Sequence, residues 1–527
     1  MKRDRAARSL AARREHNLVY KPVYIQKIVP NLYRDSVSLM QLSATLAKLP
    51  GVEQASAIMA TPANLELLRE ARLLNGDKLA ASPNDLLLAL RGKSEAALQA
   101  ALAHAVAALD KPAATASSGD LKSEPLRSLQ MALGAAPDAN LALISVPGEY
   151  AAAEAMKALR LGLNVMLFSD NVSGADELAL KRYARSRGLL VMGPDCGTAI
   201  IDGVPLGFAN AVRRGAVGVV GASGTGTQQV TCLVHRAGAG ISHAIGTGGH
   251  DLSQEIGGIT MLAGLEKLAA DKDTKVIVLI SKPPAPAVAK AVLAKAKTAG
   301  KPVVVNFVGA AIDEKGVHGA RTLEEAAAAA VALSKGKKPG KSVVKPGKVP
   351  ALRFGKTQRY IRGLFSGGTF CYEASALIGN AWSNAPVDPQ RKLQDVWKSH
   401  EHTLIDLGDD VFTRGRPHPM IDHRLRNERL LQEAADAEVA VILMDVVLGY
   451  GAHADPAGEM VPAIRKAQDI ARKKGRALAI VGAVCGTDED PQGLERQEAA
   501  LREAGMLLET SNARAALLAA ALVKKLG

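Results

Sequence analysis

The chain contains one short pattern twice: an apolar run, a turn of Ser, Gly and Thr, and a helical run. The apolar runs are residues 216–222 (AVGVVGA) and 359–365 (RYIRGLF), and each copy predicts a strand, a tight turn and a helix. A helix N-terminus presents unpaired N–H groups and a partial positive charge, and glycine lets an anion approach them. We expect the two helix ends to hold one phosphate group. The residues of the two turns are Ser223, Gly224, Thr225, Ser366, Gly367, Gly368 and Thr369.

Clusters of Gly, Ser and Thr also form ordinary turns and helix caps, so one copy alone favours phosphate binding no more than a structural role. Both copies, however, are followed by a second strand with a Gly/Asp-rich turn, at 241–258 and 403–422. Strong apolar strands then follow at 275–281 and 439–447. The repeated order predicts one fold used twice.

Length and composition indicate a multidomain α/β protein. A chain of 527 residues is too long for one core, and its 3% aromatic content suits packed α/β layers. No run of 18 apolar residues exists, so no membrane span is predicted. The basic start lacks an apolar stretch after it, which argues against a secretory signal. The four cysteines form no CxxC pair, so we expect free thiols, no metal site and a cytoplasmic protein.

The net charge of +14 is concentrated in two segments. Residues 1–22 carry seven Lys or Arg against two acids, and residues 335–362 carry ten against none. Residues 1–21 are predicted to be a disordered tail, and residues 335–356 a linker, because Pro, Gly and Lys alternate there without hydrophobic periodicity. The rest of the chain is nearly neutral, so nucleic acid is not a predicted partner.

Two further domains are predicted ahead of the duplicated part. Residues 22–112 alternate short strands and helices, which suits a small α+β domain of ferredoxin-like type. Residues 139–214 read as a βαβαβ run resembling half a Rossmann fold. The first strand of that run is not followed by G-x-G-x-x-G, so a dinucleotide fingerprint is absent.

Polar clusters at the carboxyl ends of the predicted strands supply the remaining site candidates. Arginine forks suit carboxylates or phosphates, and two prolines would hold the Arg-Gly-Arg-Pro-His-Pro turn rigid. An interface loop is the alternative for that turn. The candidates for catalysis are Arg414, Arg416 and His418, with His418 serving a proton transfer or a hydrogen bond. The candidates for substrate binding are Gly248, Gly249, His250, Asp409 and Asp410.

Two other residues could serve either the fold or a ligand. Cys371 lies in the first turn of the second predicted helix, where a thiol could be activated, although a small apolar filler is the commoner role. Asp445 ends an apolar strand and is expected to hydrogen-bond a helix terminus rather than a ligand.

The motifs MGPDCGT, GASGTG, IGTGGHDLS, SKPP, LGDDVFTRGRPHPMID and DVVLGYGAHADP together closely resemble the FdrA family, which is related to the succinyl-CoA synthetase α subunit. The resemblance runs from about Tyr24 to Leu526. It implies a CoA-ligase-like α/β fold: a Rossmann-type CoA-binding-like domain at 139–214, then flavodoxin-like domains at 215–334 and 357–527. It also implies that the two helix ends face each other across a phosphoryl site.

The resemblance implies a function as well: a subunit of oxamate carbamoyltransferase in allantoin breakdown, which exchanges carbamoyl phosphate and oxamate with oxalurate and phosphate. No cofactor is then required, and other subunits are expected as partners. An acyl-CoA ligase is the first alternative; it needs CoA and ATP with Mg²⁺, and a phosphohistidine. His318 lies in the corresponding stretch but lacks the motif around it, and no ATP-grasp segment is present. A non-catalytic scaffold that binds a phosphorylated metabolite is the second alternative.

Overall fold

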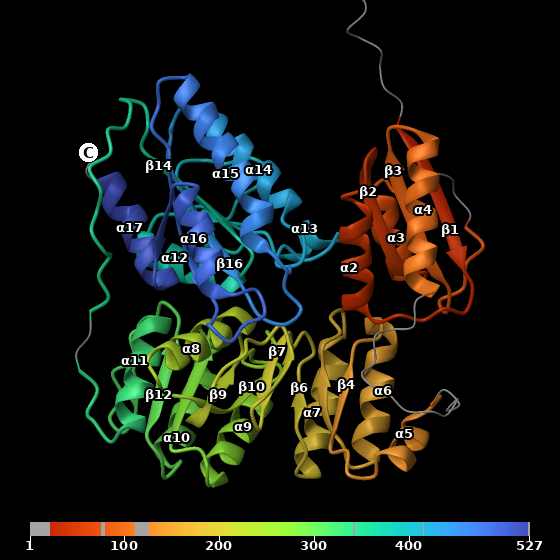
Figure 1. Ribbon diagram of the computed structural model, residues 1–527. Helices are drawn as coiled ribbons and strands as arrows, with labels where there is room; N and C mark the ends of the chain where they lie inside the picture. The colour runs from red at the N-terminus through yellow and green to blue at the C-terminus, as the bar shows by residue number, and fades with distance from the viewer. Residues whose placement is uncertain (1–21, 75–78, 111–125, 341–342, 415, 525–527) are drawn as a thin grey trace, which may run out of the picture. The chain divides into compact units, whose positions relative to one another are not determined.

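The computed structural model describes residues 22–74, 79–110, 126–340, 343–414 and 416–524. They form two compact units (Figure 1). The first unit holds the N-terminal domain and Arg414–Pro417, and the second holds Lys122–Thr413 and His418–Gly527. The predicted tail at 1–21 lies outside the described residues.

The N-terminal domain is a three-stranded antiparallel sheet, in the order β1-β3-β2, with helices on both faces. Successive residues of a strand point to opposite faces. Leu86, Leu88 and Leu90 of the central strand therefore pack with α2 and α4, while Leu87 and Ala89 pack with α3. The elements are β1 (Val23–Val29), α2 (Ser36–Leu46), β2 (Val52–Met59), α3 (Pro62–Glu70), β3 (Leu86–Gly92) and α4 (Glu95–Asp110).

This arrangement confirms the predicted small α+β domain. Thr61 caps α3 by accepting the N–H of Asn64, and Pro62 occupies the first helical position, where its missing N–H costs nothing. The ferredoxin-like pattern has four strands, and the described part of this domain has three.

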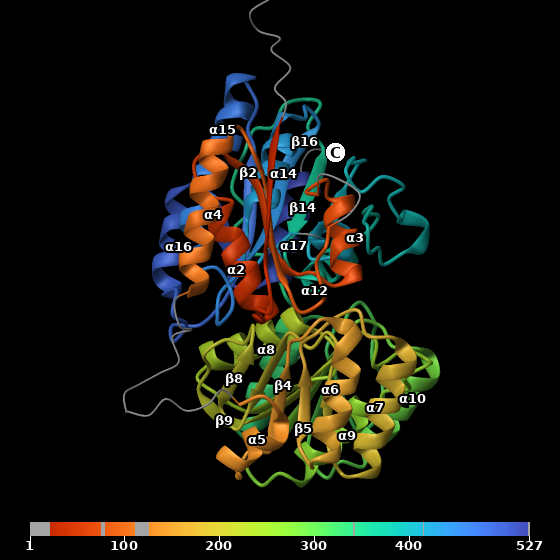
Figure 2. The same ribbon diagram turned by 90° about the vertical axis from the view of Figure 1, so that its right-hand side faces the viewer.

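The second unit begins with a three-stranded parallel sheet, in the order β4-β5-β6. Helices α6 and α7 pack side by side against it (Figure 2). The strands β4 (Leu141–Ile144), β5 (Asn164–Leu167) and β6 (Val191–Met192) alternate with α6 (Gly148–Arg160) and α7 (Gly174–Ser186), and α5 (Leu129–Ala135) precedes them. The order is the predicted Rossmann-like βαβαβ.

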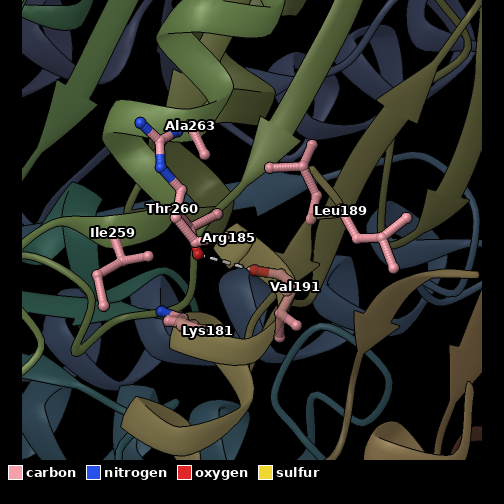
Figure 3. Close-up of a pocket in the computed structure, with 9 residues that line it drawn as sticks. Lys181, Arg185, Leu189, Val191, Ile259, Thr260 and Ala263 are labelled. Atoms are coloured by element: carbon pink, nitrogen blue, oxygen red, sulfur yellow. Dashed lines mark hydrogen bonds between the residues drawn. The ribbon is translucent and has the colours of Figure 1, made fainter. Parts of the chain in front are cut away.

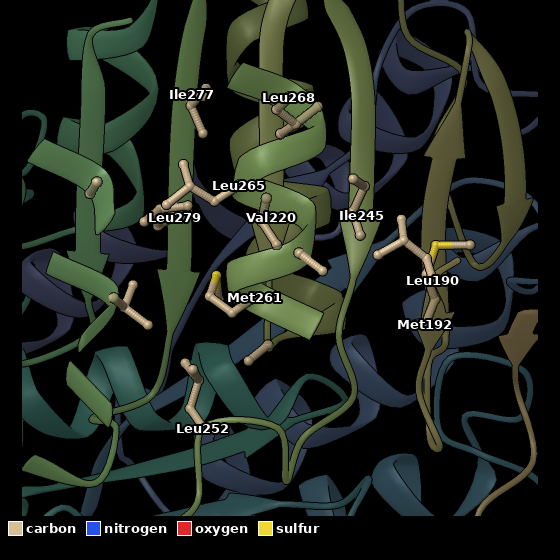
Figure 4. Packing of buried hydrophobic residues seen from close by; sticks show 14 of the residues in the cluster. Leu190, Met192, Val220, Ile245, Leu252, Met261, Leu265, Leu268, Ile277 and Leu279 are labelled. Carbon is tan, nitrogen blue, oxygen red and sulfur yellow. The ribbon is translucent and has the colours of Figure 1, made fainter. Parts of the chain in front are cut away.

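A seven-stranded sheet follows, in the order β13-β12-β11-β9-β10-β7-β8. Strands β7 and β8 form an antiparallel hairpin, and β7 pairs antiparallel to β10. The other strands of the sheet are parallel. The core on one face of β9 and β11 includes Val220, Ile277 and Leu279 and receives Leu265 and Leu268 of α9 (Figure 4).

The strands of this sheet are β7 (Thr198–Ile201), β8 (Val204–Gly207), β9 (Arg214–Gly221), β10 (Ile241–Gly246), β11 (Val276–Ser281), β12 (Val303–Phe307) and β13 (His318–Gly319). The helices are α8 (Gly224–Arg236), α9 (Ile259–Ala270), α10 (Pro286–Lys297) and α11 (Leu323–Ser334).

A five-stranded parallel sheet completes the unit, in the order β15-β14-β16-β17-β18. All nine residues of β16 are buried, which is typical of a parallel strand covered by helices on both faces. The strands are β14 (Tyr360–Phe365), β15 (Thr403–Asp406), β16 (Val439–Val447), β17 (Ala479–Cys485) and β18 (Met506–Glu509). The helices are α12 (Gly368–Ile378), η1 (Pro389–Arg391), α13 (Asp410–Thr413), α14 (Arg424–Ala435), α15 (Pro456–Lys473), α16 (Leu494–Glu503) and α17 (Asn512–Lys524).

The predicted linker at 335–356 contains no helix or strand in its described residues. Among the described helices, none is both long and apolar enough to cross a membrane.

Candidate functional site

The first Ser-Gly-Thr turn connects β9 to α8. Ser223 is the N-cap residue: its side chain accepts the N–H of Gly226 at 2.9 Å, and its carbonyl oxygen accepts the N–H of Thr227. The N–H groups of Gly224 and Thr225 have no hydrogen-bond partner in the described part of the chain. The turn therefore keeps two donors for an anion.

The second turn connects β14 to α12, and it meets the first turn directly. The hydroxyl oxygens of Ser223 and Thr369 lie 2.6 Å apart. Gly367 packs so closely on Thr225 that a β-carbon at Gly367 would stand 2.7 Å from the Thr225 methyl carbon. We call residues 223–225 and 367–369 the paired helix ends; the structure brings the two predicted turns together.

The second helix end is already partly satisfied by an internal anion. The Asp445 carboxylate accepts the N–H groups of Ser366 at 2.8 Å and of Gly367 at 2.9 Å, as well as the Ser366 hydroxyl at 2.9 Å. The expectation that Asp445 serves a helix terminus is confirmed. The N–H groups of Gly368 and Thr369 have no partner among the described residues, so these two remain available to an anion.

A buried arginine neutralises that internal anion. Arg426 donates to Asp445 Oδ1 at 2.8 Å and also to the carbonyl oxygen of Asp445. Both side chains are almost completely buried. Burial lowers the pKa of Arg426, and Asp445 acts in the opposite direction. Sequence reasoning missed Arg426, because nothing in a helical Arg-Leu-Arg run marks one arginine as buried.

Polar contacts between the two larger sheets hold the helix ends together. Asn210 donates to Asp490 Oδ2 at 2.8 Å, and Arg236 at the end of α8 donates to the Gly486 carbonyl oxygen at 2.9 Å. The ring nitrogen Nε2 of His235 lies 2.7 Å from Asp488 Oδ1. These contacts fix the C-terminus of α8 against the C-terminal domain, and the Ser223–Thr369 contact fixes its N-terminus.

Asp406 and Lys282 are charged residues beside the paired helix ends. Burial raises the pKa of Asp406 to about 6, and the nearby Lys282 ammonium lowers it. Lys282 directly follows β11, where Ile280 pairs with Gly221 of β9, so it leaves the sheet beside the Ser223 turn. Its ammonium nitrogen lies 6.0 Å from the ring centroid of Tyr372 in α12. The signal for Lys282, a polar residue after an apolar strand, was present in the sequence.

His418 borders the same region. Its Nε2 atom would lie 2.8 Å from a β-carbon at Gly408, and its Nδ1 accepts the N–H of Met420 at 3.2 Å. Burial lowers its pKa to about 4, with Arg426 contributing. The imidazole is therefore neutral at pH 7, with its proton on Nε2, and it can donate a hydrogen bond.

Arg414 and Arg416 precede His418 in the sequence, but they belong to the first compact unit, with the N-terminal domain. Arg414 and Arg416 are exposed, and an Arg414 guanidinium nitrogen lies 3.7 Å from a Glu70 carboxylate oxygen. Their assignment to substrate remains a prediction.

The residues after β10 divide into two kinds. Gly249 and His250 are exposed, whereas Gly248 is buried in a left-handed conformation, with φ of 83°. Asp251 accepts the N–H groups of α9 and pairs with the buried Lys181 at 2.8 Å. Asp251 therefore serves the fold, and the substrate roles of the other three residues stay predictions.

Two acidic residues follow β15. Asp409 accepts the N–H of Val411 and the exposed Asp410 begins α13. Desolvation, and then the charges of Asp170 and Asp410, raise the pKa of Asp195, on the loop after β6, to about 6. Carboxylates thus gather beside these loops, and no group in the described residues has the arrangement of a metal site.

Cys196 and Cys371 are buried and are not activated thiols. Burial raises the pKa of Cys196 to about 12 and that of Cys371 far above its usual range. Both favour the role of a small apolar filler.

His318 lies away from the paired helix ends. His318 lies on the edge strand β13, where it pairs with Val304 of β12. Strands β12 and β11 separate β13 from β9. Three strand spacings correspond to about 14 Å.

A hollow between α7 and α9 is also separate from the paired helix ends. Lys181, Val191 and Thr260 line it, and Thr260 donates to the Val191 carbonyl oxygen at 2.8 Å (Figure 3).

Three family models match the chain. The family described as AllF, heavy metal-associated domain, matches residues 24–125, the CoA binding domain matches 212–309, and CoA-ligase matches 364–522. The CoA binding domain match falls on the segment that sequence analysis assigned to the first flavodoxin-like domain, after the segment at 139–214. The limits of the domains therefore stay predictions.

The uncharacterized protein YahF of Escherichia coli (strain K12) is 47% identical over 510 residues, which are 94% of this chain and 98% of that protein. The succinate–CoA ligase [ADP-forming] subunit alpha-2 of Trichomonas vaginalis is 32% identical over 181 residues, 33% of this chain and 57% of that protein. Among solved structures, the dinucleotide-forming acetyl-coenzyme A synthetase 1 of Ca. Korarchaeum cryptofilum has a TM-score of 0.31 and 16% identity, covering 73% of this chain and 83% of that one.

The N-terminal domain does not carry ligands for a heavy metal. Residues 24–125 contain no cysteine, and their one histidine, His104, is exposed. Soft metals select thiolate, thioether and imidazole ligands, and the two methionines of this segment lie on different elements, Met40 on α2 and Met59 buried on β2. The residues present do not fit such an ion.

Proposed function

Because this chain belongs to the same family as YahF and joins an AllF-type domain to CoA-binding and CoA-ligase domains, we propose that it is a subunit of a carbamoyltransferase. The proposed reaction exchanges carbamoyl phosphate and oxamate with oxalurate and phosphate. The AllF-type domain supports a place in allantoin breakdown.

The observation that carries the proposal is the contact between the paired helix ends. Four N–H groups without a partner among the described residues, at Gly224, Thr225, Gly368 and Thr369, belong to two helices that meet at their N-termini. Each N-terminus carries about half a positive charge, so the pair suits a phosphate dianion. The neighbouring Lys282 adds a full positive charge.

The proposed step is acyl transfer from a good leaving group. The oxamate nitrogen bonds to the carbamoyl carbon and gives up one proton to a base, the bond from that carbon to the phosphate oxygen breaks, and the phosphate leaves with the electron pair. Fixed N–H dipoles stabilise the charge that develops on the phosphate, and such stabilisation is often the main source of an enzyme's rate enhancement. Holding both reactants in the orientation needed for attack supplies much of the remaining rate enhancement. His418 Nε2–H is proposed to donate to the substrate, and the binding of a carboxylate by Arg414 and Arg416 stays a prediction from the sequence.

An acyl-CoA ligase is the second candidate, favoured by the CoA-binding and CoA-ligase matches. The free N–H groups at the paired helix ends would suit a phosphate of CoA or a phosphoryl intermediate. The edge position of His318 argues against its carrying a phosphoryl group to those helix ends. A phosphometabolite-binding scaffold without turnover is the third candidate. Because relatives such as the Trichomonas vaginalis protein are named as alpha subunits, we propose that partner subunits complete the enzyme.

The test is phosphate release from carbamoyl phosphate, with and without oxamate, for the chain alone and with its partner subunits. Oxamate-dependent release without nucleotide or CoA supports the transferase. Acyl transfer that requires ATP and CoA and is abolished in H318A supports the ligase instead. Binding of phosphate without turnover in any combination supports the scaffold.

A further inference from the structure

Asp406 is the carboxylate next to the second helix end. It is the last residue of β15, and the register with β14 places it beside Phe365, directly before the Ser366 turn. Its Oδ2 atom lies so close to Gly368 that a β-carbon there would overlap it. Asn384 fixes the Asp406 backbone, donating to its carbonyl oxygen and accepting its N–H, both at 3.0 Å.

The two oxygens of this carboxylate differ. Oδ1 accepts the N–H of Gly408 at 3.0 Å, and no described residue donates a hydrogen bond to Oδ2. A negative charge beside an anion site weakens binding of the anion, and the fold could have used Asn for the same Gly408 contact. The unengaged Oδ2 therefore points to a role in the reaction.

Three charged groups and two neutral titratable groups lie around Asp406. Lys282 lowers its pKa, while Asp409 on its own loop and Asp445 on β16 raise it. His418, near Gly408, is neutral at pH 7, and the Cys371 thiol stays protonated. Burial is the largest influence, and the resulting pKa of about 6 leaves Asp406 mainly ionised at neutral pH yet more basic than an ordinary aspartate.

We propose that Asp406 is the general base of the transfer, and that its Oδ2 accepts the proton which the acceptor amide loses when its nitrogen bonds to the carbamoyl carbon. An amide nitrogen is a weak nucleophile, so removal of its proton during attack is what the step requires. The nitrogen–carbon bond forms, the carbon–oxygen bond to phosphate breaks, and the proton moves to Asp406. Water receives that proton after the products leave. This inference rests on the proposed carbamoyltransferase function.

The test compares D406N with wild type and with D388N, each assembled with its partner subunits. Asn keeps the acceptor for Gly408 N–H while losing the basic oxygen. Asp388 is a matched control, because it accepts a backbone N–H two residues on, from Gln390 at 3.0 Å, as Asp406 does. We expect D406N to lower kcat about 100- to 10,000-fold, the range for general base catalysis, and D388N to leave it unchanged.

Two further readouts separate a base from a structural residue. The wild-type kcat/KM for oxamate should rise with pH up to about pH 6 and then level, and D406N should lose that dependence. D406N should bind inorganic phosphate as tightly as wild type or more tightly, because a nearby negative charge is gone; a structural role predicts weaker binding. Retention of kcat within threefold, or of the wild-type pH profile, would overturn the inference alone. Absence of oxamate-dependent release in the wild type would overturn the proposed function and the base with it.

Discussion

The hydroxyl oxygens of Ser223 and Thr369 lie 2.6 Å apart, although the residues are 146 positions apart in the chain. Each belongs to the N-terminus of a helix that follows an interior strand of its own sheet, β9 in one and β14 in the other. Two partial positive charges thus meet at one point. Asp445 offsets part of that charge at the second helix end, and the N–H groups that stay without a partner among the described residues are the physical reason to connect the contact with phosphate.

Ser223→Ala should weaken phosphate binding because it removes both the cap of α8 and the contact to Thr369. Loss of one hydrogen bond corresponds to about a three- to tenfold rise in Kd. The lost cap should also cost about 1 kcal/mol of unfolding free energy. Ser173→Ala is the control, since Ser173 caps α7 in the same way, accepting the N–H of Asp176 at 3.1 Å. Calorimetric titration with phosphate measures the change in Kd, and urea unfolding measures the change in stability. Equal changes in Kd for Ser223→Ala and Ser173→Ala would contradict the assignment of Ser223 to the phosphate site.

Lys282→Met should raise the KM for carbamoyl phosphate and move the acidic limb of the pH profile upward. Lys282 holds down the pKa of Asp406, so its removal raises that pKa and delays ionisation to higher pH. Lys290→Met, which removes an exposed lysine from α10, is the control. Steady-state kinetics between pH 5 and pH 8 provide the measurement. An unchanged limb in Lys282→Met would show that Lys282 does not act on Asp406.

Asp406→Asn should stabilise the protein above pH 6. The pKa of Asp406 is 3.8 in the unfolded state and about 6 in the folded state. Between pH 3.8 and pH 6 the native state therefore binds more protons than the unfolded state. Wild-type stability from this group is complete below pH 3.8 and is lost as pH rises to about 6. The loss corresponds to roughly 3 kcal/mol. Urea unfolding should show that the unfolding free energy of Asp406→Asn exceeds that of wild type by more at pH 8 than at pH 5. An equal difference in unfolding free energy at the two pH values would contradict the prediction.

Arg426→Met should destabilise the fold strongly, because it leaves the buried Asp445 carboxylate without its cation. Breaking one partner of a buried pair costs about 3–5 kcal/mol. Arg465→Met is the control: Arg465 pairs with Glu503 at 3.3 Å on the surface, where such a pair contributes roughly 0–1 kcal/mol. Chemical denaturation monitored by circular dichroism distinguishes the two. A loss below about 1 kcal/mol for Arg426→Met would contradict the role described for it.

Much of the fold was predictable because it depends on local patterns. The apolar runs before Ser223 and Ser366 became β9 and β14, and the strands at 275–281 and 439–447 became β11 and β16. Duplication of the Ser-Gly-Thr turn predicted that two helix ends would meet. The hairpin β7–β8 was not foreseen as part of the larger sheet, because only its tertiary pairing with β10 reveals it.

The chemistry around the helix ends was less predictable. Nothing in the sequence separates Asp406, whose oxygen faces Gly368, from Asp409 and Asp410 three and four positions later. The capture of two N–H groups by Asp445 needs a contact across 78 positions, which no local pattern contains. Lys282 could have been found, since it follows a strand as the other candidates do.

The most direct test of the central claim is calorimetric titration of inorganic phosphate and carbamoyl phosphate into wild type, Gly224→Asn and Gly224→Asp. Gly224 is the first residue of α8, it is exposed, and a β-carbon there would meet only the Thr198 hydroxyl, at 3.5 Å. A carboxylate at this position favours the helix while occupying the anion's place. We expect Gly224→Asn to bind within about threefold of wild type and Gly224→Asp to lose binding. Wild-type affinity in a folded Gly224→Asp would contradict the account.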